Sequence, residues 1–375
     1  MIQARLYLLA LRRAICVFSN VGCQTVDFWY DVAKGIKRLI FFGDMKMPQE
    51  KRTLLVVTIP AFNEAGTIAD VIRRIPRAMP RVSGVDVVVI DDGSTDNTAE
   101  VAAEAGARVI SFSHNRGLGA AFSQALCTAL GLGADIIVNI DADGQFNPED
   151  IAALTGPIID NKADMVTASR FADPKLVPEM PWIKKWGNKR VADIVNKLTG
   201  QSLRDVSCGF RAYSRDAALR ATLLGGHTYT HEVILDLAFR GLRIIEVPIK
   251  VVGVRKVGKS KVAGNLWKYG WHSLIIMLRA FRDYRPMHVF GGISLVFLIL
   301  AILCGGFVLC HYIRTGAFSP YIFVAFVGGG FGFVSLICYI TALLAGMINR
   351  LRILQDEQLF LLRKQEYLPD SERKS

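Results

Sequence analysis

Two aspartates separated by a single residue, Asp141 and Asp143, are the side chains of this sequence best suited to hold a hard divalent cation. They follow the apolar run 136–140, which is typical of a buried strand, so both carboxylates can project from one turn. Carboxylate oxygens are ligands that Mg²⁺ and Mn²⁺ prefer, and such a cation can bridge the oxygens of a diphosphate. Solvated turns also carry Asp-x-Asp, so the pair alone fits either interpretation.

Polar segments also follow two earlier strand-like runs. Asp91 and Asp92 come after the apolar run 85–90, and Pro60–Glu64 comes after the run that starts at Leu54. Ligands of open parallel sheets bind outside the carboxyl ends of the strands. We therefore expect the three polar segments to converge on one crevice, which strengthens the metal interpretation.

The elements that must position these side chains are short β-rich runs alternating with helical stretches. This alternation predicts an α/β fold with a mostly parallel sheet. The expected strands are 54–59, 85–90, 108–111 and 136–140. The expected helices are 67–74, 94–105 and 117–130. Ser94 or Thr95 is the expected N-cap of the second helix.

Four motifs at these positions resemble those of the family 2 glycosyltransferases, which have the nucleotide-sugar-binding GT-A fold. The motifs are IPAFNE (59–64), DDGSTDNT (91–98), NRGLGAA (115–121) and DADGQF (141–146). Further motifs narrow the resemblance to the polyprenyl-phosphate glycosyltransferases, which include dolichyl-phosphate mannose synthases and undecaprenyl-phosphate glucosyltransferases. These motifs are SRF (169–171), DVSCGFRAYSRD (205–216), EVPI (246–249) and RKVGKSK (255–261).

The resemblance implies an inverting transfer of a hexose from a nucleotide diphosphate sugar to a polyprenyl phosphate, with Mg²⁺ or Mn²⁺ as cofactor. The donor would be GDP-mannose, UDP-glucose or a UDP-N-acetylhexosamine, and the motifs do not distinguish among them. Asp141 and Asp143 would hold the metal, and Asp143 would be catalytic. The residues implied to bind the nucleotide sugar are Pro60, Phe62, Glu64, Asp91, Asp92, Arg116, Gly117, Asp141, Gln145 and Arg170.

The distribution of positive charge points to an anionic acceptor. The net charge is +12, and residues 175–285 contain 21 Lys and Arg against 8 Asp and Glu. A phosphate monoester carries between one and two negative charges near neutral pH, so it needs cations and hydrogen-bond donors more than a strong base. The same charges would also attract anionic lipid head groups. The residues expected to bind the acceptor phosphate are Arg211, Arg255, Lys259, Ser260 and Lys261.

Asp205, just before the Cys-Gly-Phe-Arg turn, is the second expected catalytic residue. It has two open roles, as a base for a singly protonated acceptor or as a group that orients Arg211. Capping of the turn is the structural alternative. His227 and His231 have i, i+4 spacing, but the residues between them do not predict a helix. We expect these histidines to support the acceptor site and not to bind zinc.

Two charge-free stretches, 289–310 and 317–349, exceed the roughly 20 apolar residues that span a bilayer core. A mean hydropathy of +0.32 is also too high for an ordinary soluble enzyme. Arginines flank both outer ends of this hairpin and only Arg314 lies between the spans, so the positive-inside rule predicts that the catalytic domain and both termini are cytoplasmic. The seven cysteines show no paired spacing, which favours a reduced compartment.

The segment 181–198 places Ile183, Trp186, Ile194, Val195 and Leu198 roughly on one helical face. Together with its lysines this is typical of an interfacial helix, with a core-facing helix as the alternative. The proline-rich stretch 174–181 is expected to be a mobile loop over the donor site. The tail is either a helix against a neighbouring subunit or a surface helix without a partner. The expected parts of the chain are a possibly interfacial extension (1–52), a glycosyltransferase domain (53–262), juxtamembrane amphipathic helices (263–287), two spans (288–349) and a cytosolic tail (350–375).

The sequence argues against three other functions. A processive polysaccharide synthase normally carries a Gln-x-x-Arg-Trp motif and more spans, and neither is found in the sequence. An inactive membrane scaffold is disfavoured by the intact Asp92, Asp141 and Asp143. A nucleic-acid partner is not expected, because no recognition motif accompanies the basic charge. Glycines in the second span permit close helix approach within the hairpin or between subunits, so a homo-oligomer stays open.

Overall fold

The computed structural model describes residues 53–177, 180, 182–221, 229–251, 282 and 286–367. The expected N-terminal extension, most of the expected juxtamembrane helices and the end of the tail lie outside these residues. So do His227, Arg255, Lys259, Ser260 and Lys261.

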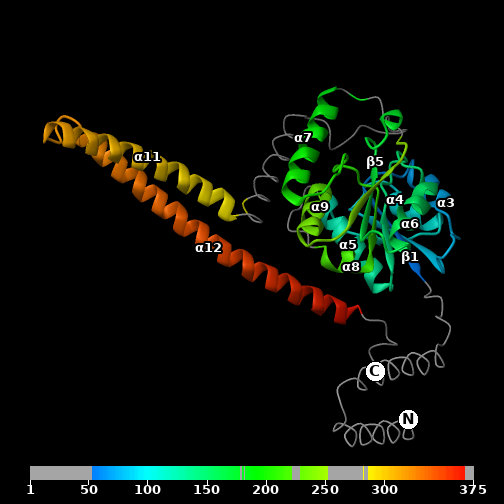
Figure 1. Cartoon of the computed structure of the whole chain (residues 1–375). Coiled ribbons are helices and arrows are strands. Elements are labelled where there is room, and N and C mark those ends of the chain that lie inside the picture. The colour runs from blue at the N-terminus through cyan, green and yellow to red at the C-terminus, as the bar shows by residue number, and fades with distance from the viewer. Residues whose placement is uncertain are drawn as a thin grey trace, which may run out of the picture. The chain divides into compact units, whose positions relative to one another are not determined.

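A seven-stranded sheet with the order β3-β2-β1-β4-β6-β5-β7 forms the centre of the fold (Figure 1). Its strands are β1 (Leu54–Ala61), β2 (Gly84–Asp91), β3 (Arg108–Ser111), β4 (Ile136–Asn139), β5 (Met165–Ser169), β6 (Arg211–Ser214) and β7 (Ile244–Pro248). All neighbours pair in parallel except β6, which runs antiparallel to both β4 and β5. The expected α/β fold with a mostly parallel sheet is confirmed.

Helices cover both faces of the sheet, because alternate strand residues point to opposite sides. On one face, Leu55, Val57 and Ile59 of β1 share a core with α3 (Ile68–Arg74), α4 (Thr98–Glu104) and α6 (Ile151–Ile159). On the other face, Val56 shares a core with the remaining helices of the domain. These are α5 (Leu118–Gly131), α7 (Trp182–Thr199), α8 (Arg215–Arg220) and α9 (Tyr229–Phe239). Short 3₁₀ turns are η1 (Pro148–Asp150) and η2 (Pro174–Leu176).

The helix expected at 94–105 begins later than the sequence indicates. α4 starts at Thr98, with Asn97 as its N-cap. Ser94 accepts a hydrogen bond from the backbone N–H of Asn63, and Thr95 donates its own N–H to the Asn63 side chain. Both expected capping residues are therefore used to hold a loop, and the helix is left to begin after them.

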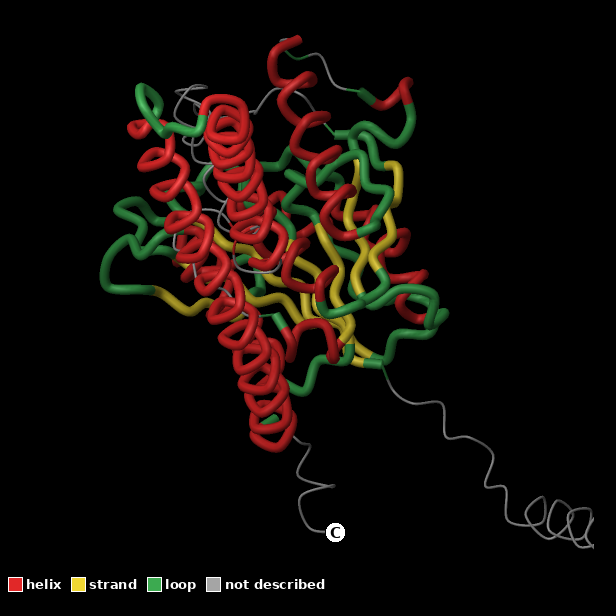
Figure 2. The backbone as a smooth tube through the Cα atoms, turned by 60° about the vertical axis from the view of Figure 1, so that its left-hand side comes forward, coloured by secondary structure: helices red, strands yellow, loops and turns green. Residues whose placement is uncertain are grey.

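Two long helices, α11 (Pro286–Thr315) and α12 (Ile322–Glu366), are long and apolar enough to cross a membrane. They lie side by side (Figure 2), and the hydroxyls of Ser294 and Ser335 each donate to the other residue's carbonyl at 2.9 Å. A side chain at Gly328 would meet the Cys304 Cβ at 2.9 Å, so the close approach expected of this glycine occurs within the hairpin. α12 continues unbroken well past Asn349, where the sequence predicted the span to end.

Candidate functional site

The register of the sheet brings the expected polar loops to one edge. Ala61 at the end of β1 pairs with Asp91 at the end of β2, and β4 pairs with the other side of β1. β6 is antiparallel, so it begins at this same edge, with Arg211 opposite Asn139. We call this the carboxyl edge, because the parallel strands end there.

The loops after β1 and β2 are joined by a set of hydrogen bonds. Asn63, in the left-handed conformation with φ 54°, donates its N–H to the Ser94 hydroxyl at 2.9 Å. Its side-chain oxygen accepts the N–H of Thr95 at 2.8 Å. The N–H of Glu64 donates to the hydroxyl of Thr98 at 2.9 Å. These contacts hold the two loops as one cradle, with the side chains of Phe62 and Glu64 half-buried beside it.

Asp91 and Asp92 are both nearly buried, and backbone amides hold their carboxylates. Asp91 accepts the N–H of Ser94 at 3.0 Å. Asp92 accepts the N–H of Arg116 at 2.7 Å and that of Gly117, the N-cap of α5, at 3.0 Å. In this arrangement Asp92 fixes the loop before α5.

The loop after β2 needs a glycine where it passes the loop before α5. Gly93 has φ 70°, and a Cβ added there would lie 2.5 Å from the carbonyl carbon of His114. Any side chain would push the loop away, so Gly93 permits the close approach of the two backbones.

The Arg116 side chain is exposed, with its guanidinium 4.7 Å from the centre of the Phe112 ring.

The Asp141–Asp143 pair follows β4 at the carboxyl edge. Asp143 is 3% exposed and accepts the N–H of Gln145 at 3.0 Å, and Asp141 and Gln145 are half-buried. Gly144 turns the chain with φ 70°. Among the described residues no group of three or more His, Cys, Asp or Glu could hold a metal. Two carboxylates fit a hard divalent cation whose remaining ligands are substrate oxygens and water.

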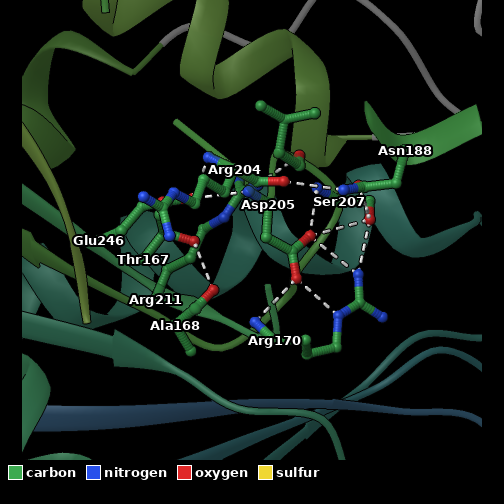
Figure 3. A network of polar contacts seen from close by, with 10 residues as sticks. Thr167, Ala168, Arg170, Asn188, Arg204, Asp205, Ser207, Arg211 and Glu246 are labelled. Carbon is green, nitrogen blue, oxygen red and sulfur yellow. Dashed lines mark hydrogen bonds and ion pairs between the residues drawn. The ribbon is translucent and has the colours of Figure 1, made fainter. Parts of the chain in front are cut away.

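The buried Asp205 forms an ion pair with the half-buried Arg170 at the same edge (Figure 3). The guanidinium of Arg170 donates from Nε to Oδ2 at 2.6 Å and from Nη2 to Oδ1 at 2.9 Å, which is a bidentate contact. The Ser207 hydroxyl accepts from Arg170 at 2.7 Å and has a single proton to donate, either to the Asn188 side chain on α7 at 3.0 Å or to Asp205 at 3.1 Å. The backbone N–H of Ser207 donates to Asp205 at 3.2 Å. Asp205 is fully buried, while 22% of the Arg170 side chain is exposed.

The surroundings of Asp205 keep it ionised. Burial opposes the charged form, but the hydrogen bonds from Arg170 outweigh it, so the pKa of Asp205 lies below its ordinary value. From β7, Glu246 accepts the N–H groups of Arg204 and Asp205 at 2.8 and 2.6 Å. Burial raises the pKa of this Glu246 carboxyl despite those two bonds. One expected role of Asp205 was to orient Arg211, but Asp205 forms its ion pair with Arg170, and the Arg211 guanidinium donates to backbone carbonyls.

Arg211, expected to bind the acceptor phosphate, is fully buried in this structure. Its guanidinium donates to the carbonyl of Thr230 at 2.7 Å and to that of Val206 at 3.1 Å. His231 lies buried nearby, and burial together with the charge of Arg211 lowers the pKa of His231 to about 4. His231 is thus neutral at physiological pH. Arg211 joins the 205–210 loop to α9.

Pro60, which was expected to bind the nucleotide sugar, is buried within β1, where it pairs with Ile90. Five residues that join the loops of the site had no expected role there: Ser94, which was expected only as a helix N-cap, and Thr98, Asn188, Ser207 and Glu246. The ST-rich stretch after Asp91-Asp92 was the only signal for the first two, because such hydroxyls favour turns and caps. Asn188, Ser207 and Glu246 meet through tertiary contacts that no local pattern reports.

α7 presents two distinct faces. Val195 and Leu198, expected on the membrane-facing side, are buried in the domain. Trp182 and Trp186 are 74% and 53% exposed, and Ile194 is also exposed. The apolar positions of this helix therefore divide between the core and an exposed aromatic surface.

Comparison with known proteins agrees with this arrangement. Residues 56–220 match Glycosyl transferase family 2. The UDP-N-acetylglucosamine–dolichyl-phosphate N-acetylglucosaminyltransferase of Methanococcus voltae is 34% identical over 219 residues, which cover 53% of this chain and 86% of the relative. The polyprenol monophosphomannose synthase of Mycolicibacterium smegmatis is 30% identical over 225 residues, which cover 57% of this chain and 82% of that relative.

A solved structure of glucosyl-3-phosphoglycerate synthase from Mycobacterium tuberculosis, with Mn²⁺, UDP-glucose and phosphoglyceric acid, is 26% identical. It aligns with a TM-score of 0.48 and covers 64% of this chain and 82% of that chain. The similarity to the two sequence relatives spans more than four-fifths of each of them. The chain therefore belongs to glycosyltransferase family 2, in its polyprenyl-phosphate glycosyltransferase group.

Proposed function

We propose that this protein transfers a hexose from a nucleotide diphosphate sugar to a polyprenyl phosphate, with inversion at the anomeric carbon. The observation that carries the proposal is the presence, at one sheet edge, of the Asp141–Asp143 pair and of an arginine held by a buried carboxylate. The two sites are connected, because the side-chain amide of Asn139 at the end of β4 donates to the carbonyl of Gly209 in the 205–210 loop.

The donor would lie along the carboxyl edge. The cradle formed by the loops after β1 and β2 would receive the base and ribose, beside Phe62 and Glu64. Asp141 and Asp143 would hold Mg²⁺ or Mn²⁺, which neutralises charge on the departing diphosphate when bound. Arg170 keeps part of its side chain accessible, and Asp205 fixes its guanidinium in one orientation. Arg170 would thus direct positive charge toward the sugar diphosphate.

In the reaction, an oxygen of the acceptor phosphate attacks the anomeric carbon and forms the new C–O bond. The C–O bond to the diphosphate breaks, and its electron pair leaves with the nucleoside diphosphate. A phosphate dianion needs no base. Asp205 is already ionised and accepts several hydrogen bonds, so we assign it the positioning of Arg170 instead of proton transfer. Asp143 remains the proposed catalytic carboxylate.

The acceptor site is proposed in a revised form. Arg255, Lys259, Ser260 and Lys261 stay as the predicted phosphate ligands. Arg211 is proposed to hold the 205–210 loop against α9, because both its terminal nitrogens donate to backbone carbonyls. The exposed tryptophans of α7 would lie at the bilayer surface, where the acceptor phosphate is located. The arginines flanking the hairpin favour a cytoplasmic catalytic domain.

The test is a transfer assay with purified protein in detergent, a short-chain polyprenyl phosphate, Mg²⁺ or Mn²⁺ and a panel of GDP- and UDP-hexoses. We expect radiolabel to enter the organic phase from one donor and to be lost with a chelator or in Asp143→Asn. Asp150→Asn is the matched control, since Asp150 lies on η1 and has no assigned role. Failure of every donor with nucleotide still bound would contradict the proposal and favour a non-enzymatic scaffold.

A further inference from the structure

The second apolar helix, α12, is much longer than a membrane span requires. α12 is a single helix of 45 residues, whereas a bilayer core needs only about 20. Its charge-free part ends at Asn349, and residues 350–366 continue it by about 25 Å at 1.5 Å per residue. From its sequence, this segment was expected to lie against a neighbouring subunit or to have no partner. The structure instead places it against the catalytic domain of its own chain.

Phe360 anchors this contact. Its side chain is 7% exposed and belongs to the same core as α5, α8 and α9. The guanidinium of Arg220 at the end of α8 lies 3.8 Å from the centre of the Phe360 ring and donates to Glu357 at 2.9 Å. The aromatic ring supplies the apolar burial, and the ion pair fixes the rotation of the helix.

Polar contacts extend the attachment on both sides of Phe360. Arg240, after α9, binds Asp356 at 3.1 Å and Asp236 at 2.9 Å. Arg363 donates to the carbonyls of Leu219 and Ala221 at 3.1 and 3.0 Å, which satisfies acceptors at the end of α8.

The last contact reaches the edge of the sheet opposite the site. Arg215, which follows the end of β6, donates to the carbonyl of Tyr367 and, at 2.7 Å, to that of Ala134 just before β4. A side chain bound at this far edge touches none of the donor residues. The segment can therefore act on the reaction only through the placement of the whole domain.

We propose that residues 350–367 form a rigid strut that sets the distance and rotation of the catalytic domain relative to the second span. The inference rests on the proposed function, because a lipid-anchored phosphate must be met at one height above the bilayer. A flexible tether would let the height and orientation of the catalytic domain vary. A continuous helix that is bound to the domain at three successive turns fixes both.

The test inserts alanines between Arg350 and Leu351 and measures transfer in proteoliposomes. Two residues rotate the strut by about 200°, and four rotate it by about 40° while lengthening it by about 6 Å. We expect two alanines to lower transfer to a long-chain acceptor by about tenfold or more, four to lower it less, and both to leave transfer to a short, water-soluble prenyl phosphate within about twofold. Equal long-chain activity across the series would mean a flexible tether and overturn the proposal.

Point variants give a second test that does not depend on the reaction. In Glu357→Arg and Phe360→Ala, hydrogen exchange of the 352–366 amides in nanodiscs should rise, and Gln358→Arg, at the neighbouring exposed position, should leave it unchanged. Recovery of protection in the exchanged pair R220E/E357R would support the ion pair. Unchanged exchange in Glu357→Arg and Phe360→Ala would refute the strut. If the wild-type protein transfers to neither acceptor, the proposed function fails, and the exchange data still decide the strut.

Discussion

At the scale of single residues, the contacts of Asp205 favour the proposed positioning role over that of a base. A base must gain a proton during the reaction, but Asp205 accepts hydrogen bonds from Arg170, from Ser207 and from the Arg170 backbone. These bonds favour the charged form. The carboxylate is better suited to hold a cation in place than to exchange a proton.

We therefore predict that Asp205→Asn weakens donor binding and folding together. Removing one partner of a buried pair costs several kcal/mol, and about 3 kcal/mol is expected here because Arg170 keeps some solvent contact. Arg170→Gln should have a similar effect on the KM for the donor, and the double variant should be little worse than either single one. The checks are urea unfolding in detergent and donor KM. A large kcat loss in Asp205→Asn, with an altered pH profile and unchanged KM, would instead identify a base.

The lowered pKa of buried His231 predicts that the free energy of unfolding depends on pH. Its pKa is about 4 in the folded protein and about 6.5 when exposed, so below pH 6.5 the unfolded chain binds a proton that the folded chain does not. The free energy of unfolding should fall as pH drops from 6.5 to 4, by on the order of 3 kcal/mol, and then level off for this group. The contribution of Asp205, whose pKa is depressed, should be lost only below about pH 4.

The measurement is urea unfolding of the detergent-solubilised protein at several pH values. His231→Gln keeps a polar side chain without a titrating group and should flatten the curve between pH 6.5 and 4. His114→Gln is the control, because His114 is exposed. An unchanged curve in His231→Gln would show that another group carries the dependence.

At the scale of elements, the sequence predicted strand positions well, because the pattern of apolar residues involves only neighbours along the chain. The strands 54–59, 85–90 and 108–111 were predicted within two residues, because alternating and apolar runs report burial directly. The start of α4 was missed, since Ser94 and Thr95 bond to a loop 31 and 32 residues away. The partner of Asp205 was missed for the same reason, because Arg170 is 35 residues distant and meets it only once β5 and β6 pair.

Helix faces were harder to predict than helix existence. The apolar positions on one face of α7 do not reveal which residues face the core and which face the membrane, since lipid and protein interior are both apolar. Val195 and Leu198 were therefore grouped with Trp186, although they point into the domain. Likewise the mixed charges of the tail gave no sign that Phe360 would enter the core.

At the scale of the whole molecule, the proposed reaction requires a water-soluble donor and a lipid-anchored acceptor to meet. Asn188 links the donor site to α7, because it lies on this helix and accepts the hydroxyl of Ser207, whose backbone N–H donates to Asp205. The outer surface of α7 carries Trp182 and Trp186, whose rings combine a large apolar area with an N–H donor. Such side chains suit the interface between head groups and acyl chains.

We predict that replacing both tryptophans with alanine raises the KM for a long-chain acceptor in proteoliposomes by about tenfold, from the loss of roughly 1–2 kcal/mol of interfacial contact. Because both side chains are exposed, the free energy of unfolding in detergent should change by no more than about 0.5 kcal/mol. The KM for the nucleotide sugar and for a short soluble acceptor should stay the same. When both tryptophans are replaced by phenylalanine, the KM for the long-chain acceptor should stay close to that of the wild-type protein. Equal long-chain KM values in all three proteins would mean that α7 does not contact the bilayer, and that α11 and α12 alone bring the catalytic domain to its acceptor.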